Sequence, residues 1–198
     1  MVRAFWLALV AGLIGAGVAL ADPPVGVEAP RATIDTGTLV GTVEGPARIF
    51  RAIPYAAPPV GPLRWRPPAA PAPWKVERVA TADGPACLQA VYPGGRPNLG
   101  GYAGRVSEDC LTLDVFAPLR AARAPVLVWI FGGGNVAGAD SIPPNDGRFF
   151  ARDGVVMVAM NYRLGALGFF AHPALTREAG ASAPLANYAV MDQIAALK

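Results

Sequence analysis

The sequence predicts an α/β fold in which an antiparallel N-terminal hairpin leads into a mixed, mostly parallel sheet. Short alternating strands with a turn between them occupy residues 32–45, which is typical of a hairpin. Two uninterrupted apolar runs follow at 126–131 and 155–160, and such runs indicate strands that are buried on both faces of a parallel sheet. The segment between these two runs is long enough for the crossover that parallel pairing requires.

Composition limits the classes of function. The 198 residues suit one domain, and the contents of 53% hydrophobic and 16% charged residues argue against a disordered chain. The formal net charge of +3 is spread along the chain without a Lys/Arg cluster, so nucleic acid is not an expected partner. We expect no cofactor and no metal ion, and the sequence indicates no oligomeric state.

The first 21 residues are predicted to be a secretory signal peptide. Arg3 supplies the positive start, residues 4–20 are uncharged and apolar, and Ala19-Leu20-Ala21 has the small residues of a cleavage site. The alternative is an uncleaved membrane anchor, because the apolar run approaches the length of a membrane span. Cleavage would leave 22–198 as the mature domain, secreted or periplasmic, and the signal would be its only contact with a membrane.

The hairpin and its continuation come next. Thr33–Asp35 and Thr38–Val43 flank a turn that contains Gly37, and 48–55 continues as another short strand. Residues 56–74 are rich in proline, which excludes a regular helix or a central strand. We therefore expect this segment to run over the surface of the domain.

Cys87 and Cys110 are the only cysteines. In an exported chain a single pair predicts a disulfide, and two free buried thiols are the alternative. The bridge would stabilise the fold by about 3 kcal/mol in the chain-entropy model. The segment between them, 88–109, is rich in Gly, Pro and Asn and has little apolar periodicity of its own.

The remaining elements follow from apolar periodicity. Residues 111–116 alternate as a half-exposed strand. Helices are predicted over 146–152, ended by Gly154, over 164–170 as a short irregular helix, and over 187–198 from helical spacing. The last helix has no stop signal before the final residue, and we interpret this as truncation inside a helix.

Three glycines, Gly132–Gly134, follow the first buried strand. Without a Cβ they allow a tight turn and let backbone N–H groups come close to a ligand. The alternative is a flexible turn without chemistry.

Several motifs in the same order resemble the N-terminal part of the type-B carboxylesterases. They are Ile53-Pro54-Tyr55-Ala56, Pro58-Pro59-Val60-Gly61, Leu63-Arg64-Trp65, Glu108-Asp109-Cys110-Leu111, Gly132-Gly133-Gly134, Asn161-Tyr162-Arg163-Leu164-Gly165, Asn187-Tyr188 and Asp192-Gln193. The resemblance extends from about residue 32 to residue 198. That family includes the cholinesterases and is built on the α/β-hydrolase fold, so it implies the N-terminal part of that fold.

The resemblance also implies a chemistry. Family members hydrolyse small-molecule carboxylic esters with a Ser-His-acid triad. Gly133 and Gly134 would donate N–H groups to the oxyanion, Gly132 would shape the turn, and the residue after the nucleophile would be the third donor. Losing one such donor costs roughly 3 kcal/mol in comparable sites.

The family's nucleophile elbow, Gly-x-Ser-x-Gly, would lie beyond the helix that contains Asp192, so the fold is expected to be truncated before it. The three serines, Ser107, Ser141 and Ser182, do not lie on a strand-to-helix elbow and are not credible nucleophiles. The family's catalytic histidine comes last in the chain, so His172 is expected to be structural. These 198 residues alone should therefore be inactive.

Two ion pairs are expected from the family: Arg64 with Glu108, and Arg163 with Asp192. The alternative is four solvated charges, and buried pairs would contribute more to positioning than to net stability. Phe131 occupies a position where many relatives have His or Tyr, which changes the pocket wall without removing a donor.

Two functions remain open at the level of sequence. The first is a carboxylic ester hydrolase in the full-length protein, and the second is a non-catalytic binding or adhesion protein on the same fold. Cholinesterase activity is not expected, because cholinesterases use a tryptophan between the two cysteines. Residues 88–109 contain Tyr92 and Tyr102 but no tryptophan, and tyrosine makes a weaker cation–π contact.

Overall fold

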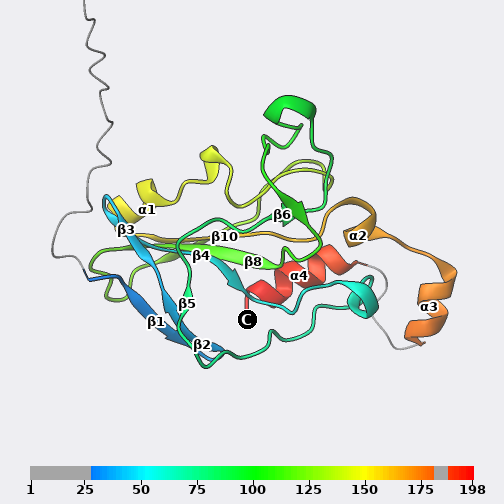
Figure 1. Ribbon diagram of the computed structural model, residues 1–198, viewed down its shortest axis with the longest axis horizontal. Helices are drawn as coiled ribbons and strands as arrows, with labels where there is room; N and C mark the ends of the chain where they lie inside the picture. Colours follow the sequence, from blue (N-terminus) through cyan, green and yellow to red (C-terminus); the bar gives the residue numbers. More distant parts are fainter. Residues whose placement is uncertain (1–27, 181–186) are drawn as a thin grey trace, which may run out of the picture.

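The computed structural model describes residues 28–180 and 187–198. The predicted signal peptide, 1–21, and Ser182 lie outside the described residues. The main body is a twisted mixed sheet, with helix α1 on one side and helix α4 on the other (Figure 1).

The main sheet has five strands in the order β3-β4-β8-β10-β9. Their bounds are Thr42–Glu44 for β3, Ala47–Pro54 for β4, Thr112–Pro118 for β8, Val156–Met160 for β10 and Val126–Trp129 for β9. Among the described strands of this sheet, only β10 and β9 pair in parallel, with Val156 opposite Val126, while the other pairings are antiparallel. The sheet is therefore mixed, as predicted, but among the described residues it is mostly antiparallel and not mostly parallel.

The predicted N-terminal hairpin is confirmed. Strands β1 (Arg31–Ile34) and β2 (Gly37–Val40) pair antiparallel, and the short strand β5 (Arg78–Val79) adds to β2 in parallel. Leu39 on β2 packs with Phe50 and Ile53 of β4, which fixes the hairpin against one face of the main sheet. A third, two-stranded sheet joins β6 (Ala86–Cys87) to β7 (Val106–Ser107) next to the cysteines.

The helices are short. They are the 3₁₀ turns Gly61–Leu63, Pro93–Gly95 and Pro143–Asn145, and the α-helices α1 (Arg148–Arg152), α2 (Gly165–Phe169), α3 (Pro173–Ala179) and α4 (Tyr188–Ala196). Three of the α-helices were expected from the sequence, and α3 was not. Among the residues that the structure describes, no helix has the length and apolar character needed to cross a bilayer.

The proline-rich segment runs over the surface, as predicted, and two tryptophans attach it. The Trp65 indole N–H donates to the Ala166 carbonyl at 2.9 Å, and the Trp74 indole N–H donates to the Thr38 carbonyl at 3.0 Å. Because proline has no backbone N–H, this segment cannot form the hydrogen-bond ladder of a strand, and the indole N–H groups of the two tryptophans hold it instead.

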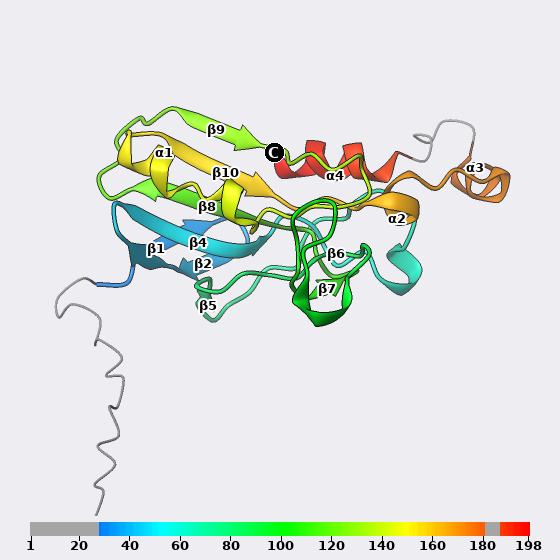
Figure 2. The ribbon, with the colours of Figure 1, turned by 90° about the horizontal axis from the view of Figure 1, so that it is seen from above.

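The prediction that 126–131 is buried on both faces is wrong for β9. This strand is the edge of the five-stranded sheet (Figure 2), and Val126, Trp129 and Ile130 are all exposed. Within the described residues β10 pairs with one edge of β9, and no strand pairs with the other. Apolar composition identified a strand, but burial depends on which elements cover it.

The prediction that 111–116 is a half-exposed strand is also wrong. Strand β8 is central, between β4 and β10, and its buried side chains include the polar Thr112 and Asp114. The apolar Leu113 and Val115 point to the opposite face, where they pack in the cluster around Leu39. The alternation was real, but the polar face of the strand is covered and not exposed to solvent.

Candidate active site

The glycine turn begins from a firmly held aromatic residue. Phe131 is buried and stacks on Tyr162, with 4.5 Å between the ring centroids. The Tyr162 hydroxyl donates to the Phe131 carbonyl at 2.5 Å, and burial raises the pKa of Tyr162, so the hydroxyl remains a donor. The end of β9 is thereby tied to the segment that leaves β10.

The conformation of the turn requires glycine. Gly133 has φ +138°, and a Cβ at this position would lie 1.9 Å from the Ala137 carbonyl oxygen. Gly134 follows with φ +62°. The N–H groups of Val136 and Ala137 both donate to the Gly133 carbonyl at 3.2 Å, which closes the turn.

The two predicted donors are free. Among hydrogen bonds of the described residues, none is donated by the N–H of Gly133 or Gly134. Gly133 is half-buried, and its neighbours Gly132 and Gly134 are exposed. The chain thus places two adjacent backbone donors without partners on an accessible turn, an arrangement suited to an anionic oxygen.

Hydrogen bonds from other segments of the chain hold this turn in place. The Asn135 carbonyl accepts from the Gly165 N–H at 2.7 Å. The Gln89 side-chain amide pairs with both backbone groups of Gly138: its Nε2 donates to the carbonyl at 2.7 Å, and its Oε1 accepts from the N–H at 2.8 Å. Asn98 supports Gln89 by donating to the same Oε1 at 2.7 Å.

Sequence reasoning missed Gln89 and Asn98. They lie in a loop rich in Gly, Pro and Asn, where no periodicity marks an inward-facing side chain. Asn98 is nevertheless buried, and its Oδ1 accepts from the backbone of Gly100 and Tyr102. The loop between the cysteines therefore supports the glycine turn, and no signal in the sequence would have shown this.

The structure brings Arg163 and Asp192 together in the interior. The Arg163 Nε and Nη2 donate to the two carboxylate oxygens of Asp192 at 2.8 and 2.7 Å, and the side chains are only 4% and 0% exposed. Burial raises the pKa of Asp192, while the hydrogen bonds from Arg163 oppose that rise. A third donor, Arg163 Nη1, reaches the Arg66 carbonyl at 2.9 Å. The pair joins the exit of β10 to α4 and to the proline-rich segment.

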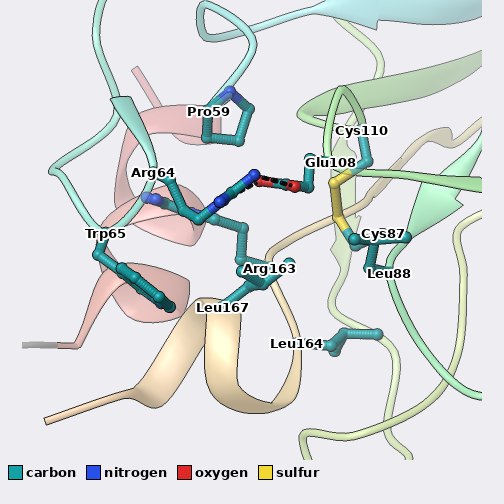
Figure 3. A pocket seen from close by; sticks show the side chains of 10 residues that line it. All are labelled: Pro59, Arg64, Trp65, Cys87, Leu88, Glu108, Cys110, Arg163, Leu164 and Leu167. Atoms are coloured by element: carbon teal, nitrogen blue, oxygen red, sulfur yellow. Dashed lines mark hydrogen bonds and ion pairs between the residues drawn. A yellow bond between two sulfur atoms is a disulfide. The ribbon is translucent and has the colours of Figure 1, made fainter. Parts of the chain in front are cut away.

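The other expected pair lies nearer the surface. Arg64 Nε and Nη2 donate to the two carboxylate oxygens of Glu108, both at 2.6 Å, beside the disulfide (Figure 3). Cys87 and Cys110 form that disulfide, with a Cα–Cα distance of 5.0 Å. The proline-rich segment is thus attached to the cysteine loop at this point.

Among the described residues, Ser107 and Ser141 do not form a nucleophile–base pair with His172. Ser107 accepts from the Asp109 N–H at 3.0 Å, and Ser141 lies on the wall of a different cavity. His172 accepts from the Ala174 N–H through Nδ1 at 3.1 Å and so caps helix α3, a structural role. Within the described residues no serine hydroxyl is hydrogen-bonded to a histidine.

The two loop tyrosines differ in accessibility. Tyr102 is buried, and its hydroxyl donates to the Arg105 carbonyl at 2.7 Å, whereas Tyr92 is exposed. Of this pair, only Tyr92 presents its ring to solvent, and the expectation against cholinesterase activity stays a prediction.

A second polar feature lies between β8 and the loop that joins β9 to α1. Asp114 and Asp140 are both buried beside a cavity of about 260 Å³. Burial raises the pKa of Asp114 to about 7 and raises the pKa of Asp140 well above its ordinary value. In the part of the chain that the structure describes, no group of three or more His, Cys, Asp or Glu residues is placed to hold a metal ion.

Comparison with known proteins agrees with the fold. A model of the carboxylesterase family matches residues 28–198. The chain is 44% identical over 162 residues to the fumonisin B1 esterase of Sphingopyxis macrogoltabida, covering 79% of this chain and 28% of that protein. It is 47% identical over 145 residues to the phenmedipham hydrolase of Pseudarthrobacter oxydans, covering 72% and 29%.

The solved structure of a PNB esterase superposes with a TM-score of 0.75 at 38% identity, covering 86% of this chain and 34% of that one. The chain therefore spans about three tenths of the length of these curated relatives and about a third of the length of this solved structure.

Proposed function

The chain belongs to the carboxylesterase family, and from this premise we propose that it is the N-terminal part of a serine-type carboxylic ester hydrolase whose oxyanion donors are Gly133 and Gly134. The observation that supports the proposal is the pair of adjacent N–H groups without partners on an accessible turn. A binding protein has no need of such donors, because they stabilise charge that develops only in a transition state.

The role of these donors follows from their geometry. When a nucleophile attacks the ester carbonyl, the oxygen gains negative charge, and N–H groups that are already oriented need no reorganisation. The Phe131–Tyr162 contact, the Gln89–Gly138 contact and the short turn at Gly133 fix the backbone before substrate arrives. Each donor of this kind contributes roughly 3 kcal/mol of transition-state stabilisation.

The nucleophile, the histidine and the triad acid would come from sequence outside these 198 residues. The position of the exposed edge of β9 directly before the turn is consistent with this, because further strands could cover it. The small-molecule carboxylic ester is the substrate class that this site would accept.

Replacing Gly133 with alanine in the full-length protein tests the proposal. The added Cβ would meet the Ala137 carbonyl at 1.9 Å, so the backbone must move and the donors are displaced. We expect kcat for a p-nitrophenyl ester to fall by about 10²–10³-fold. The matched control is Gly45→Ala, which also replaces a glycine of positive φ but in a hairpin turn with no atom within 4 Å of the new Cβ.

Three results are informative. Loss of turnover in Gly133→Ala but not in Gly45→Ala, with unchanged circular dichroism, supports the proposal. Full activity of Gly133→Ala contradicts the assignment of the donors. A folded full-length protein without any ester turnover favours the binding or adhesion alternative.

We also propose that the protein is secreted or periplasmic, with cleavage after Ala21. The Cys87–Cys110 disulfide supports this, because such bonds persist mainly in oxidising compartments. N-terminal sequencing of protein recovered from the medium or periplasm should start at Asp22. Recovery of all the protein from the reducing cytosol would contradict the placement.

A further inference from the structure

The cavity beside Asp114 and Asp140 is not explained by ester hydrolysis. It has a volume of about 260 Å³ and lies between β4, β8 and the loop that joins β9 to α1. The glycine turn occupies the first part of this loop, and Asp140, Ser141 and Asn145 lie further along it. The cavity wall therefore belongs to the same loop as the proposed oxyanion donors.

Two carboxyl groups of this wall are buried and form no ion pair with any described residue, although the charge of Arg51 acts on Asp114. Asp114 is 2% exposed and Asp140 is 3% exposed. Asp114 accepts one hydrogen bond, from the Ala52 N–H at 2.9 Å, at an irregularity of β4 where Ala52 has φ +52°. Asp140 forms no ion pair with a described residue, and hydrogen bonds from the side chains of Asn161 and Ser141 oppose the rise that burial causes in its pKa.

The arginines at the cavity are committed to other acids. Arg51 pairs with Glu44 at 2.8 Å and with Asp83 at 3.0 Å. Arg148 pairs with Asp146 at 2.6 Å and reaches Glu44 at 3.5 Å. The cavity is lined by four carboxyl groups and two guanidinium groups, an excess of two negative charges when all are ionised. A buried carboxylate without a partner is costly, so this excess calls for a cation or for protons.

Other wall groups fit a small cation that donates hydrogen bonds. The Asn145 side-chain amide donates through Nδ2 to the Ala139 carbonyl at 2.7 Å, which leaves its Oδ1 available as an acceptor. The Ser141 hydroxyl can also accept. Among the described residues no three acids are placed together to hold a metal ion, and the apolar Phe116 and Ile142 beside the aspartates suit a cation with an alkyl part.

We propose that this cavity is a binding site for a protonated primary amine, whose ammonium group donates hydrogen bonds to Asp140 and Asp114. The alkyl part of the amine would lie along Phe116 and Ile142, two apolar residues of the wall. Protons compete for the same carboxyl groups, because burial raises the pKa of both aspartates. The site is separate from the proposed ester hydrolysis and does not depend on it.

Calorimetric titration of the full-length protein with n-butylammonium tests the proposal, with 1-butanol as the uncharged probe of similar shape. At about pH 8 we expect saturable binding of the ammonium with a Kd near about 1 mM, and none of the alcohol. Asp140→Asn, which removes the charge and keeps the shape, should weaken binding at least about tenfold. The control Asp153→Asn removes an exposed carboxylate that pairs with Arg152 away from the cavity, and it should leave binding unchanged.

A second measurement needs no variant. In the unmodified protein, protonation of the carboxyl groups should weaken butylammonium binding by about tenfold or more between about pH 8 and pH 5. Loss of binding both at low pH and in Asp140→Asn supports the site. The proposal is overturned if the folded protein shows no saturable binding up to about 100 mM probe, which would mean that protons alone neutralise the cavity. It is also overturned if affinity is the same in Asp140→Asn or independent of pH.

Discussion

Two regions of the molecule contain buried aspartates, and the aspartates differ in whether they have an arginine partner. At the exit of β10, Asp192 is fully buried and receives three hydrogen bonds from Arg163, two from its guanidinium group and one from its backbone N–H. At the cavity near α1, Asp114 and Asp140 are almost equally buried, and neither has an arginine partner among the described residues. Burial alone therefore does not define what a carboxyl group does.

The partner makes the difference. Hydrogen bonds from the Arg163 guanidinium oppose the rise that burial causes in the pKa of Asp192, and the pair can fix α4 against the segment after β10. Without such a partner the neutral form is favoured at Asp114 and Asp140, and these groups respond to pH or to a cation. The first region is a structural contact, and the second is a site that can change state.

The largest effect in this comparison should come from Asp192→Asn. The substitution keeps the shape but leaves the buried Arg163 guanidinium without a counter-charge, which costs about 3–5 kcal/mol of unfolding free energy. Urea unfolding followed by circular dichroism measures this cost.

The matched control for Asp192→Asn is Arg64→Gln, which breaks the more exposed pair with Glu108. Because water screens that pair, its loss should change stability little. Equal effects of the two substitutions would show that the buried pair has no special role.

A smaller effect is expected at the cavity, and it depends on pH. The pKa of Asp114 is about 7 in the folded protein and 3.8 is its ordinary value, so the folded state binds more protons between these limits. The contribution of Asp114 to stability should therefore be greatest below about pH 4, fall as pH rises to about 7, and then level off.

Asp114→Asn should remove this slope and raise stability at pH 8 by about 2 kcal/mol, roughly half of the full linkage value, because the side chain lines a cavity that is large enough for water to enter. Urea midpoints at pH 5 and pH 8 measure the change. A slope that survives in Asp114→Asn would assign the titration to Asp140 or to another group.

The sequence predicted most elements but misjudged two strands. The apolar run at β9 and the alternation at β8 were correct signs of strands. The predicted burial was wrong for both strands, because burial depends on the neighbouring strands in the sheet. Among the described residues β9 has one strand beside it, whereas β8 lies between β4 and β10. Asp114 was unnoticed for this reason, since its alternating position suggested a solvent-facing residue.

In the candidate site, too, the sequence predicted some features and missed others. The glycines were identifiable because a turn with Gly133 at φ +138° tolerates no side chain, and this constraint is local. The contacts that hold the turn were not identifiable, because Gln89 and Gly138 are 49 residues apart and neither belongs to a periodic element. Sequence patterns report local geometry, whereas such contacts arise only when the loops pack together.

By itself the sequence determined the α/β class, the hairpin, the glycine turn and the resemblance to an esterase family, because each depends on the local choice of residues. The tertiary structure alone decided that β9 is an edge strand, that Gln89 holds Gly138, and that Asp140 is buried without an arginine partner among the described residues. The physical reason is that desolvation and pairing depend on distances between segments remote in the chain, and these distances are fixed only when the sheet and its loops are assembled.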